Sequence, residues 1–122
     1  MHIAILEDNE IKIILLKDAI ETLVGKRSTI LEYKTLTEFK NNRKHSFDLM
    51  ISDLHLPDSS GKETAQFLSQ YGLKIAKHIV IFSADHELGT SLIHAHTNRF
   101  SQVKDLSNLN LTLDKVLETF VN

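Results

Sequence analysis

The chain has 122 residues, of which 42% are hydrophobic and 25% are charged. A chain of this size forms one globular domain around one buried core, so we expect a single domain over residues 1–122. The net charge of −2 and the absence of any run of Lys and Arg argue against direct nucleic-acid binding. Cysteine is absent, which excludes disulfide bonds and thiol chemistry.

From its first residues, we expect the chain to carry no targeting signal. Residues 1–6 are mostly apolar and run directly into Glu7 and Asp8, without a basic segment or a cleavage site. No apolar run reaches the length that spans a bilayer. Together with the lack of cysteine, this predicts a cytoplasmic protein that does not bind the membrane.

Short apolar runs rich in β-branched residues alternate with longer stretches of helical period. This alternation is typical of a parallel sheet covered by helices, so we predict an α/β fold. Five strands are predicted, at residues 2–6, 29–33, 48–52, 78–82 and 100–104.

The segments between the strands carry helix signals. The first is predicted to end before Gly25, a typical C-terminal stop, and its apolar positions recur at helical spacing: Ile11, Ile14, Leu15, Ala19 and Leu23. Thr35 with Glu38, and Ser60 with Glu63, have the spacing of capping boxes. They predict the starts of two further helices.

The second of these helices is predicted to end at Tyr71-Gly72. Residues 86–96 are predicted as a mobile helix, because Gly89 and its neighbours lower helix propensity. The last helix, near residues 111–121, carries a broad apolar face made by Leu111, Leu113, Val116, Leu117 and Phe120.

Polar or small side chains follow the predicted strands. Glu7 and Asp8 follow the first strand, Asp53 follows the third, Ser83 follows the fourth, and Lys104 ends the fifth. In open parallel sheets ligands bind outside the carboxyl ends of the strands. The candidate functional residues are therefore expected at one edge of the sheet.

Three carboxylates at one edge repel one another unless a cation neutralises them. Oxygen ligands select a hard ion such as Mg²⁺, which leaves room for a phosphate oxygen. Asp53 could then attack phosphorus as a carboxylate nucleophile. Mg²⁺ and Lys104 would offset the charge of the transferring group, and the Ser83 hydroxyl would donate to one of its oxygens.

Four motifs follow one another along the chain: Glu7-Asp8-Asn9, then Asp53-Leu54-His55-Leu56-Pro57 with Gly61, then Ser83-Ala84, then Lys104. In order and spacing they resemble the receiver domain of bacterial response regulators, over essentially the whole chain. The resemblance implies a flavodoxin-like three-layer sandwich. Its parallel sheet would have five strands in the order 2-1-3-4-5, with five helices.

The resemblance also implies a role for each site residue. Asp53 is the phosphorylation site, Ser83 the switch hydroxyl and Lys104 the basic partner of the phosphoaspartate. The Mg²⁺ ligands it implies are Glu7, Asp8, Asp53 and the backbone carbonyl of His55.

The chain departs from the family pattern after the fifth strand. Asp105 replaces the usual proline after the lysine, so we expect a trans peptide bond and a shifted loop. Ser101 stands at the place of the usual switch aromatic, and Phe100, one residue earlier, points to the opposite face. His55 and Asp85 occupy positions that in the family tune loss of the phosphoryl group.

The expected function is a phosphorylation-dependent switch of a two-component system, and not an enzyme beyond slow loss of its own phosphate. A degenerate receiver that no longer accepts phosphate is the main alternative. A metal-dependent phosphohydrolase with an aspartyl nucleophile would need an acid where His55 stands. A nucleotide- or flavin-binding module would need a Gly-rich phosphate loop, which the sequence lacks.

The resemblance implies two kinds of partner. A histidine kinase or histidine phosphotransfer protein supplies the phosphoryl group, and a downstream protein or an output domain beyond residue 122 receives the signal. In the family, partners dock on the face made by the fourth helix, the fifth strand and the fifth helix. A homodimer through this face is a further expectation.

Overall fold

The structure is a computed structural model that describes residues 1–25, 27–42, 46–96 and 98–121. Five strands form one parallel sheet in the order β2-β1-β3-β4-β5, as predicted. The strands are β1 (His2–Leu6), β2 (Thr29–Tyr33), β3 (Phe47–Ser52), β4 (Ala76–Phe82) and β5 (Phe100–Val103). The helices are α1 (Glu10–Val24), α2 (Leu36–Asn42), α3 (Gly61–Phe67), α4 (Leu73–Ile75), α5 (His86–Ala95) and α6 (Leu109–Val121).

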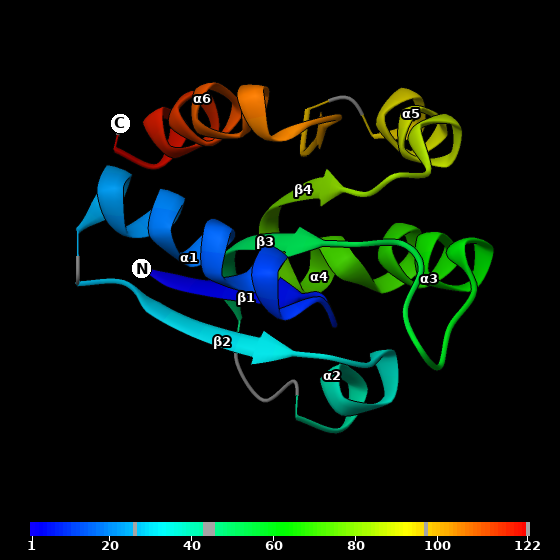
Figure 1. The fold of residues 1–122 in the computed structure, drawn as a ribbon. Coiled ribbons are helices and arrows are strands. Elements are labelled where there is room, and N and C mark those ends of the chain that lie inside the picture. The colour runs from blue at the N-terminus through cyan, green and yellow to red at the C-terminus, as the bar shows by residue number, and fades with distance from the viewer. Residues whose placement is uncertain (26, 43–45, 97, 122) are drawn as a thin grey trace.

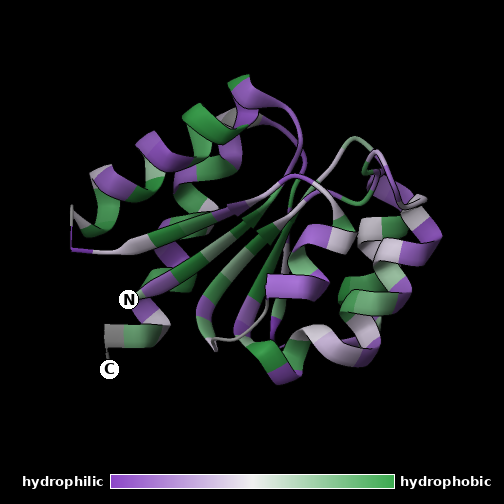
Figure 2. Ribbon diagram, turned by 90° about the horizontal axis from the view of Figure 1, so that it is seen from below, coloured by the Kyte–Doolittle hydropathy of each residue, from purple (hydrophilic) through white to green (hydrophobic). Residues whose placement is uncertain are grey.

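The helices cover both faces of the sheet. Figure 1 shows α1 and α6 on one side and α2, α3, α4 and α5 on the other. Because α3 and α4 are joined by a π-helical turn, they form one connection, and the chain has five helical connections as predicted. Figure 2 shows the hydrophobic colour concentrated on the central strands, since a sheet covered on both faces buries both sets of side chains.

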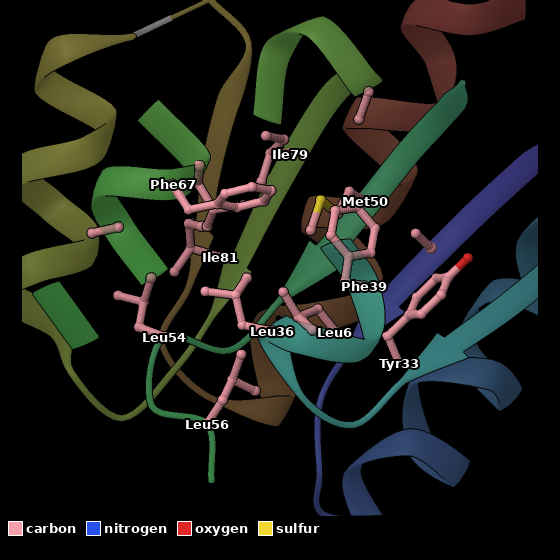
Figure 3. Packing of buried hydrophobic residues seen from close by; sticks show 14 of the residues in the cluster. Leu6, Tyr33, Leu36, Phe39, Met50, Leu54, Leu56, Phe67, Ile79 and Ile81 are labelled. Atoms are coloured by element: carbon pink, nitrogen blue, oxygen red, sulfur yellow. The ribbon is translucent and has the colours of Figure 1, made fainter. Parts of the chain in front are cut away.

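Two hydrophobic clusters fill the space between the layers. The cluster under α2, α3 and α5 is shown in Figure 3 and includes Leu6, Tyr33, Leu36, Phe39, Met50, Leu54, Leu56, Phe67, Ile79 and Ile81. The cluster under α1 and α6 includes Ile3, Ile5, Ile13, Leu16, Ile51, Val80, Val103 and Leu113. Leu54 and Leu56 lie beyond the end of β3, so the first cluster extends into the loop that follows Asp53.

The apolar residues at helical spacing in α1 lie only partly on its inner face, where Ala19 is buried and Leu23 packs against the core. The buried residues are Ile13, Leu16, Ala19 and Ile20. Ile11, Ile14 and Leu15 are instead 70%, 64% and 37% exposed. The helix is apolar around most of its first half, so two faces have helical spacing and only packing selects the buried one. Gly25 ends the helix as predicted, with φ 75° and its N–H donating to the carbonyl of Glu21.

The third helical connection does not end at Tyr71-Gly72. It continues through the π-helical turn Leu68–Gly72 into α4. Gly72 is helical, with φ −56°, and a Cβ there would lie 2.6 Å from Cδ1 of Ile79. The glycine therefore permits close packing on β4 and does not act as a stop.

The remaining helix predictions are largely confirmed. Ser60 and Glu63 form a capping box at the start of α3, and Thr35 Oγ1 accepts a 3.0 Å hydrogen bond from Glu38 N at the start of α2. Residues 86–95 form a regular helix. Leu111 is 56% exposed and does not belong to the buried face of α6. In the described part of the chain, no helix has the length and apolar character to span a membrane.

Candidate functional site

Three carboxylates meet at the carboxyl edge of the sheet. One carboxylate oxygen each from Glu7, Asp8 and Asp53 can be chosen so that all lie within 4.8 Å of one another. Glu7 is buried, Asp53 is half-buried and Asp8 is exposed. The structure thus brings together the three acids that the sequence predicted, although it tests no function for them.

Glu7 has an environment that disfavours its negative charge. Its backbone N–H donates to the carbonyl of Tyr33 at 2.9 Å, which fixes it between the ends of β1 and β2. Burial, and then the charge of Asp53, raise the pKa of Glu7 from 4.5 to about 7. Lys12 Nζ lies 3.5 Å from Glu7 Oε1 and partly opposes this rise. A divalent cation in the cluster would offset the repulsion between the carboxylates of Glu7 and Asp53.

Asp53 is held by the backbone around it. Its N–H donates to the carbonyl of Leu6 at 2.9 Å, which continues the pairing of β3 with β1 beyond the strand. Leu54 N donates to Asp53 Oδ1 at 2.7 Å, and the hydroxyl of Ser52 donates to the carbonyl of Asp53 at 2.6 Å. The carboxylate is thereby oriented by local contacts and remains partly accessible.

Ser83 and Lys104 stand at the ends of the neighbouring strands β4 and β5. Ser83 is 3% exposed, and its hydroxyl oxygen accepts a 3.2 Å hydrogen bond from Asp85 N. Lys104 is exposed, and its side chain has no hydrogen bond or ion pair with another described residue. Both residues lie at the predicted edge, but the contacts expected with a phosphoryl group remain predictions.

The side chains of His55 and Asp85, from the loops after β3 and β4, form a bridge. His55 Nε2 lies 2.8 Å from Asp85 Oδ2, and this contact holds the pKa of Asp85 below its ordinary value. Asp85 Oδ1 accepts a hydrogen bond from Leu88 N, so the same side chain caps α5. A Cβ on Gly61 would lie 2.8 Å from the His55 ring, and the glycine therefore lets the imidazole cross the start of α3.

The bridge borders a pocket of about 450 Å³ between α3 and α5. Its lining consists of His55, Ser60, Gly61, Lys62, Asp85, Glu87, Leu88 and Ser91. The pocket is open to solvent, and none of the three carboxylates belongs to its lining. It does not enclose a substrate against them.

The segment around β5 matches the predicted departures from the family pattern. No peptide bond among the described residues is cis, so Lys104 and Asp105 are joined by a trans bond. Phe100 is buried in the cluster under α2, α3 and α5, whereas Ser101 Oγ lies 2.9 Å from His78 Nε2. Neighbouring side chains on the strand thus point to opposite faces.

Three residues near the site were not singled out by the sequence. Lys12 lies beside Glu7. Gln102 donates to the carbonyl of His86 at 2.9 Å and accepts from Thr90, which ties β5 to α5. Asp58 binds the start of α2. Only Asp58 had a local signal, a Pro-Asp turn, and that signal does not name its distant partner.

Comparison with known proteins shows the fold. The chain is similar to the phosphorylated cyanobacterial phytochrome response regulator RcpA, with 23% identity and a TM-score of 0.67 over 99% of this chain and 94% of that one. It is similar to the response regulatory domain of protein mrkE from Klebsiella pneumoniae, with 21% identity and a TM-score of 0.72 over 99% and 98% of the two chains. It is also similar to the Mn²⁺-bound response regulator Rcp1, with 16% identity and a TM-score of 0.68 over 99% and 94%.

These similarities cover nearly the whole chain, and they show that it has the receiver-domain fold of response regulators. No protein-family model and no curated protein sequence matches the chain. The comparisons therefore show the fold, and the function must be argued from the site residues.

Proposed function

We propose that this chain is a phosphorylation-dependent switch of a two-component system, in which Asp53 accepts the phosphoryl group. The observation that carries the proposal is the cluster of Glu7, Asp8 and Asp53 within 4.8 Å at the carboxyl edge of a receiver fold. RcpA, which shares this fold, is phosphorylated. Ser83 follows β4, the strand next to β3, and Lys104 follows β5, the next strand along, so both stand at the same edge as Asp53.

The three acids fit a hard divalent cation, because they offer oxygen ligands at close range in a partly buried place. Rcp1 has the same fold and binds Mn²⁺. Glu7, Asp8, Asp53 and the backbone carbonyl of His55 would hold Mg²⁺ in this chain. When bound, the ion offsets negative charge on the transferring group.

The residues of the chain supply the rest of the reaction. A carboxylate oxygen of Asp53 attacks phosphorus and forms an O–P bond, while the N–P bond to the donor histidine breaks. The leaving imidazole nitrogen keeps the electron pair and takes a proton from solvent. Lys104 moves to pair with the phosphoryl oxygens, and the Ser83 hydroxyl leaves Asp85 N to donate to one of them. This displacement of Ser83 would shift the start of α5 and so carry the signal.

The phosphoryl donor would be a histidine kinase or a histidine phosphotransfer protein. The exposed side chains of Ile11, Ile14 and Leu15 form an apolar surface on the first turns of α1, directly after the acid pair. A contiguous exposed apolar surface marks an interaction site. We infer that the donor rests on this surface while its histidine reaches Asp53.

The signal would leave through a downstream protein or an output domain, which would dock on the face made by α5, β5 and α6 or act through a homodimer there. The chain would not act on external substrates, apart from phosphorylating itself with small donors and losing its phosphate slowly. His55 and Asp85, whose side chains contact each other at 2.8 Å, would tune the rate of that loss.

A small phosphodonor such as acetyl phosphate, with Mg²⁺, tests the proposal. Intact-mass spectrometry is expected to show one phosphoryl group on the parent chain and none on the Asp53→Asn variant. The Asp114→Asn variant, which changes an exposed acid on α6, should gain the group as the parent does. A parent that stays unmodified, with no response of its amide spectrum to beryllofluoride, would instead identify a degenerate receiver that interacts without phosphorylation.

A further inference from the structure

The loop that follows Asp53 contains a tight turn. Leu56 N donates to the carbonyl of Ser59 at 3.1 Å, and Ser59 N donates back to the carbonyl of Leu56 at 3.2 Å. Pro57 and Asp58 form the tip of this turn. The base of the turn is fixed to the hydrophobic core, because Leu54 is fully buried and Leu56 is 8% exposed.

Asp58 extends from the tip of the turn to the start of α2. Its Oδ1 accepts from Leu36 N at 2.9 Å, and its Oδ2 accepts from Thr37 N at 2.8 Å and from Thr37 Oγ1 at 2.6 Å. These donors lie 21 or 22 residues earlier in the sequence. The free N–H groups of a first helical turn need acceptors, and a carboxylate is favoured there by the helix dipole. Asp58 thus caps a helix to which it does not belong.

The partner of Asp58 is itself fixed to the core. Leu36 and Phe39 of α2 are buried in the same cluster as Leu54 and Leu56. Figure 1 shows α2 beside the loop between β3 and α3. The turn is therefore held at its base by buried leucines and at its tip by α2, which is itself packed on the core. His55 lies between the two buried leucines, within the segment fixed in this way.

We propose that Asp58 is a positioning residue of the metal site, which holds the turn after Asp53 so that the His55 carbonyl stays available as a ligand. The inference rests on the proposed function, since it assumes that Mg²⁺ binds at the acid cluster. Residues that orient metal ligands without touching the metal commonly change the affinity by a factor of ten or more when they are replaced. By linkage, an ion that orders the turn also strengthens the contact with α2.

A magnesium titration followed by amide NMR tests this role in the parent chain and in three variants. Asp58→Ala removes all three acceptor contacts, and we expect the dissociation constant for Mg²⁺ to rise about tenfold. Asp58→Asn keeps the shape and one acceptor oxygen, so it should recover part of the affinity. Thr35→Ala removes the cap that α2 receives from its own sequence, and it should leave the affinity unchanged.

Amide hydrogen exchange gives a second measurement that does not depend on the metal. Without Mg²⁺, Leu56 and Ser59 should exchange faster in Asp58→Asn than in the parent or in Thr35→Ala. With Mg²⁺, exchange of Leu36 and Thr37 should slow in the parent and change less in Asp58→Asn.

Equal Mg²⁺ affinities for the parent and both Asp58 variants, with unchanged exchange at Leu56 and Ser59, would overturn the inference. An equal loss of affinity in Thr35→Ala would also overturn it, because stability of α2 alone would then explain the effect. If the parent bound no Mg²⁺, the proposed function would fail. The metal-free exchange rates would then decide alone whether Asp58 holds the turn.

Discussion

The two loops that flank the candidate site are built differently. The β3–α3 loop, residues 53–60, has buried Leu54 and Leu56 and reaches α2 through Asp58. The β5–α6 loop, residues 104–108, begins with exposed Lys104 and Asp105. Asp105 Oδ1 accepts from Ser107 N, the hydroxyl of Ser107 and the side chain of Asn108, all within three residues.

The difference shows how the site divides its tasks. The loop of the nucleophile is fixed by contacts with distant parts of the chain, so its geometry is part of the fold. The described hydrogen bonds of the β5–α6 loop join residues within that loop, and the exposed side chain of Lys104 is free to move toward a charge that arrives. Substitutions in the β3–α3 loop should therefore lower the free energy of unfolding. Substitutions in the β5–α6 loop should instead lower the rate of phosphorylation.

The largest expected effect is on the first loop. Leu54→Ala removes a fully buried side chain and should lower the free energy of unfolding by about 2–5 kcal/mol, because it leaves a cavity. Urea denaturation measures the change. The matched control is Leu111→Ala, which removes an exposed leucine and should stay within about 0.5 kcal/mol of the parent. Similar losses in the two variants would contradict the conclusion that buried Leu54 fixes the first loop to the core.

A smaller effect, on reactivity alone, is expected for the second loop. Lys104→Ala should slow phosphorylation by acetyl phosphate about a hundredfold, since one charge that stabilises the transferring group is lost. The free energy of unfolding should change by no more than about 0.5 kcal/mol. Mass spectrometry over time gives the rate, with Lys115→Ala as the control for an exposed lysine. An unchanged rate would remove Lys104 from the site.

The smallest expected effect is on the pH dependence of stability, which should differ between variants of the two loops. Hydrogen bonds from Thr37, and then from Leu36, lower the pKa of Asp58 from 3.8 to about 2, and hydrogen bonds from Ser107 lower that of Asp105. A lowered pKa in the folded state adds stability that is present above pH 3.8 and is lost as the pH falls toward 2. Between pH 5 and pH 2, Asp58→Asn should therefore flatten the fall of stability with acid.

Asp105→Asn should flatten that fall less, because its contacts persist partly in the unfolded chain. Denaturation midpoints at several pH values compare the variants. If the denaturation midpoint changed equally with pH in the two variants, the contact of Asp58 with α2 would contribute no more to the pH dependence than the local contacts of Asp105. That result would contradict the comparison of the two loops.

The sequence predicted the sheet well. Four of the five strands end where expected, and the fifth ends one residue earlier, at Val103. Strands buried on both faces read as short apolar runs, and the polar residues that follow them mark where they stop. For the same reason Glu7, Asp8 and Asp53 could be placed at one edge from the sequence, and the structure brings them together.

The misplaced features all depend on contacts between distant segments. Ile14 and Leu111 are apolar and at helical spacing, but packing of α1 beside α6 leaves both exposed. Gly72 is a residue type that often ends helices, yet here it permits close packing against Ile79. In each case the residue type is compatible with two environments.

The amino-acid sequence by itself determined the order of strands and helices and the identity of the acids at the sheet edge, because both follow from local periodicity and from residues next to strand ends. Only the tertiary structure decided which face of α1 is buried and where Asp58 binds. Those outcomes depend on which surfaces meet across 20 or more residues of chain, as in the contact of Asp58 with Thr37, 21 residues away, and local spacing does not encode that choice.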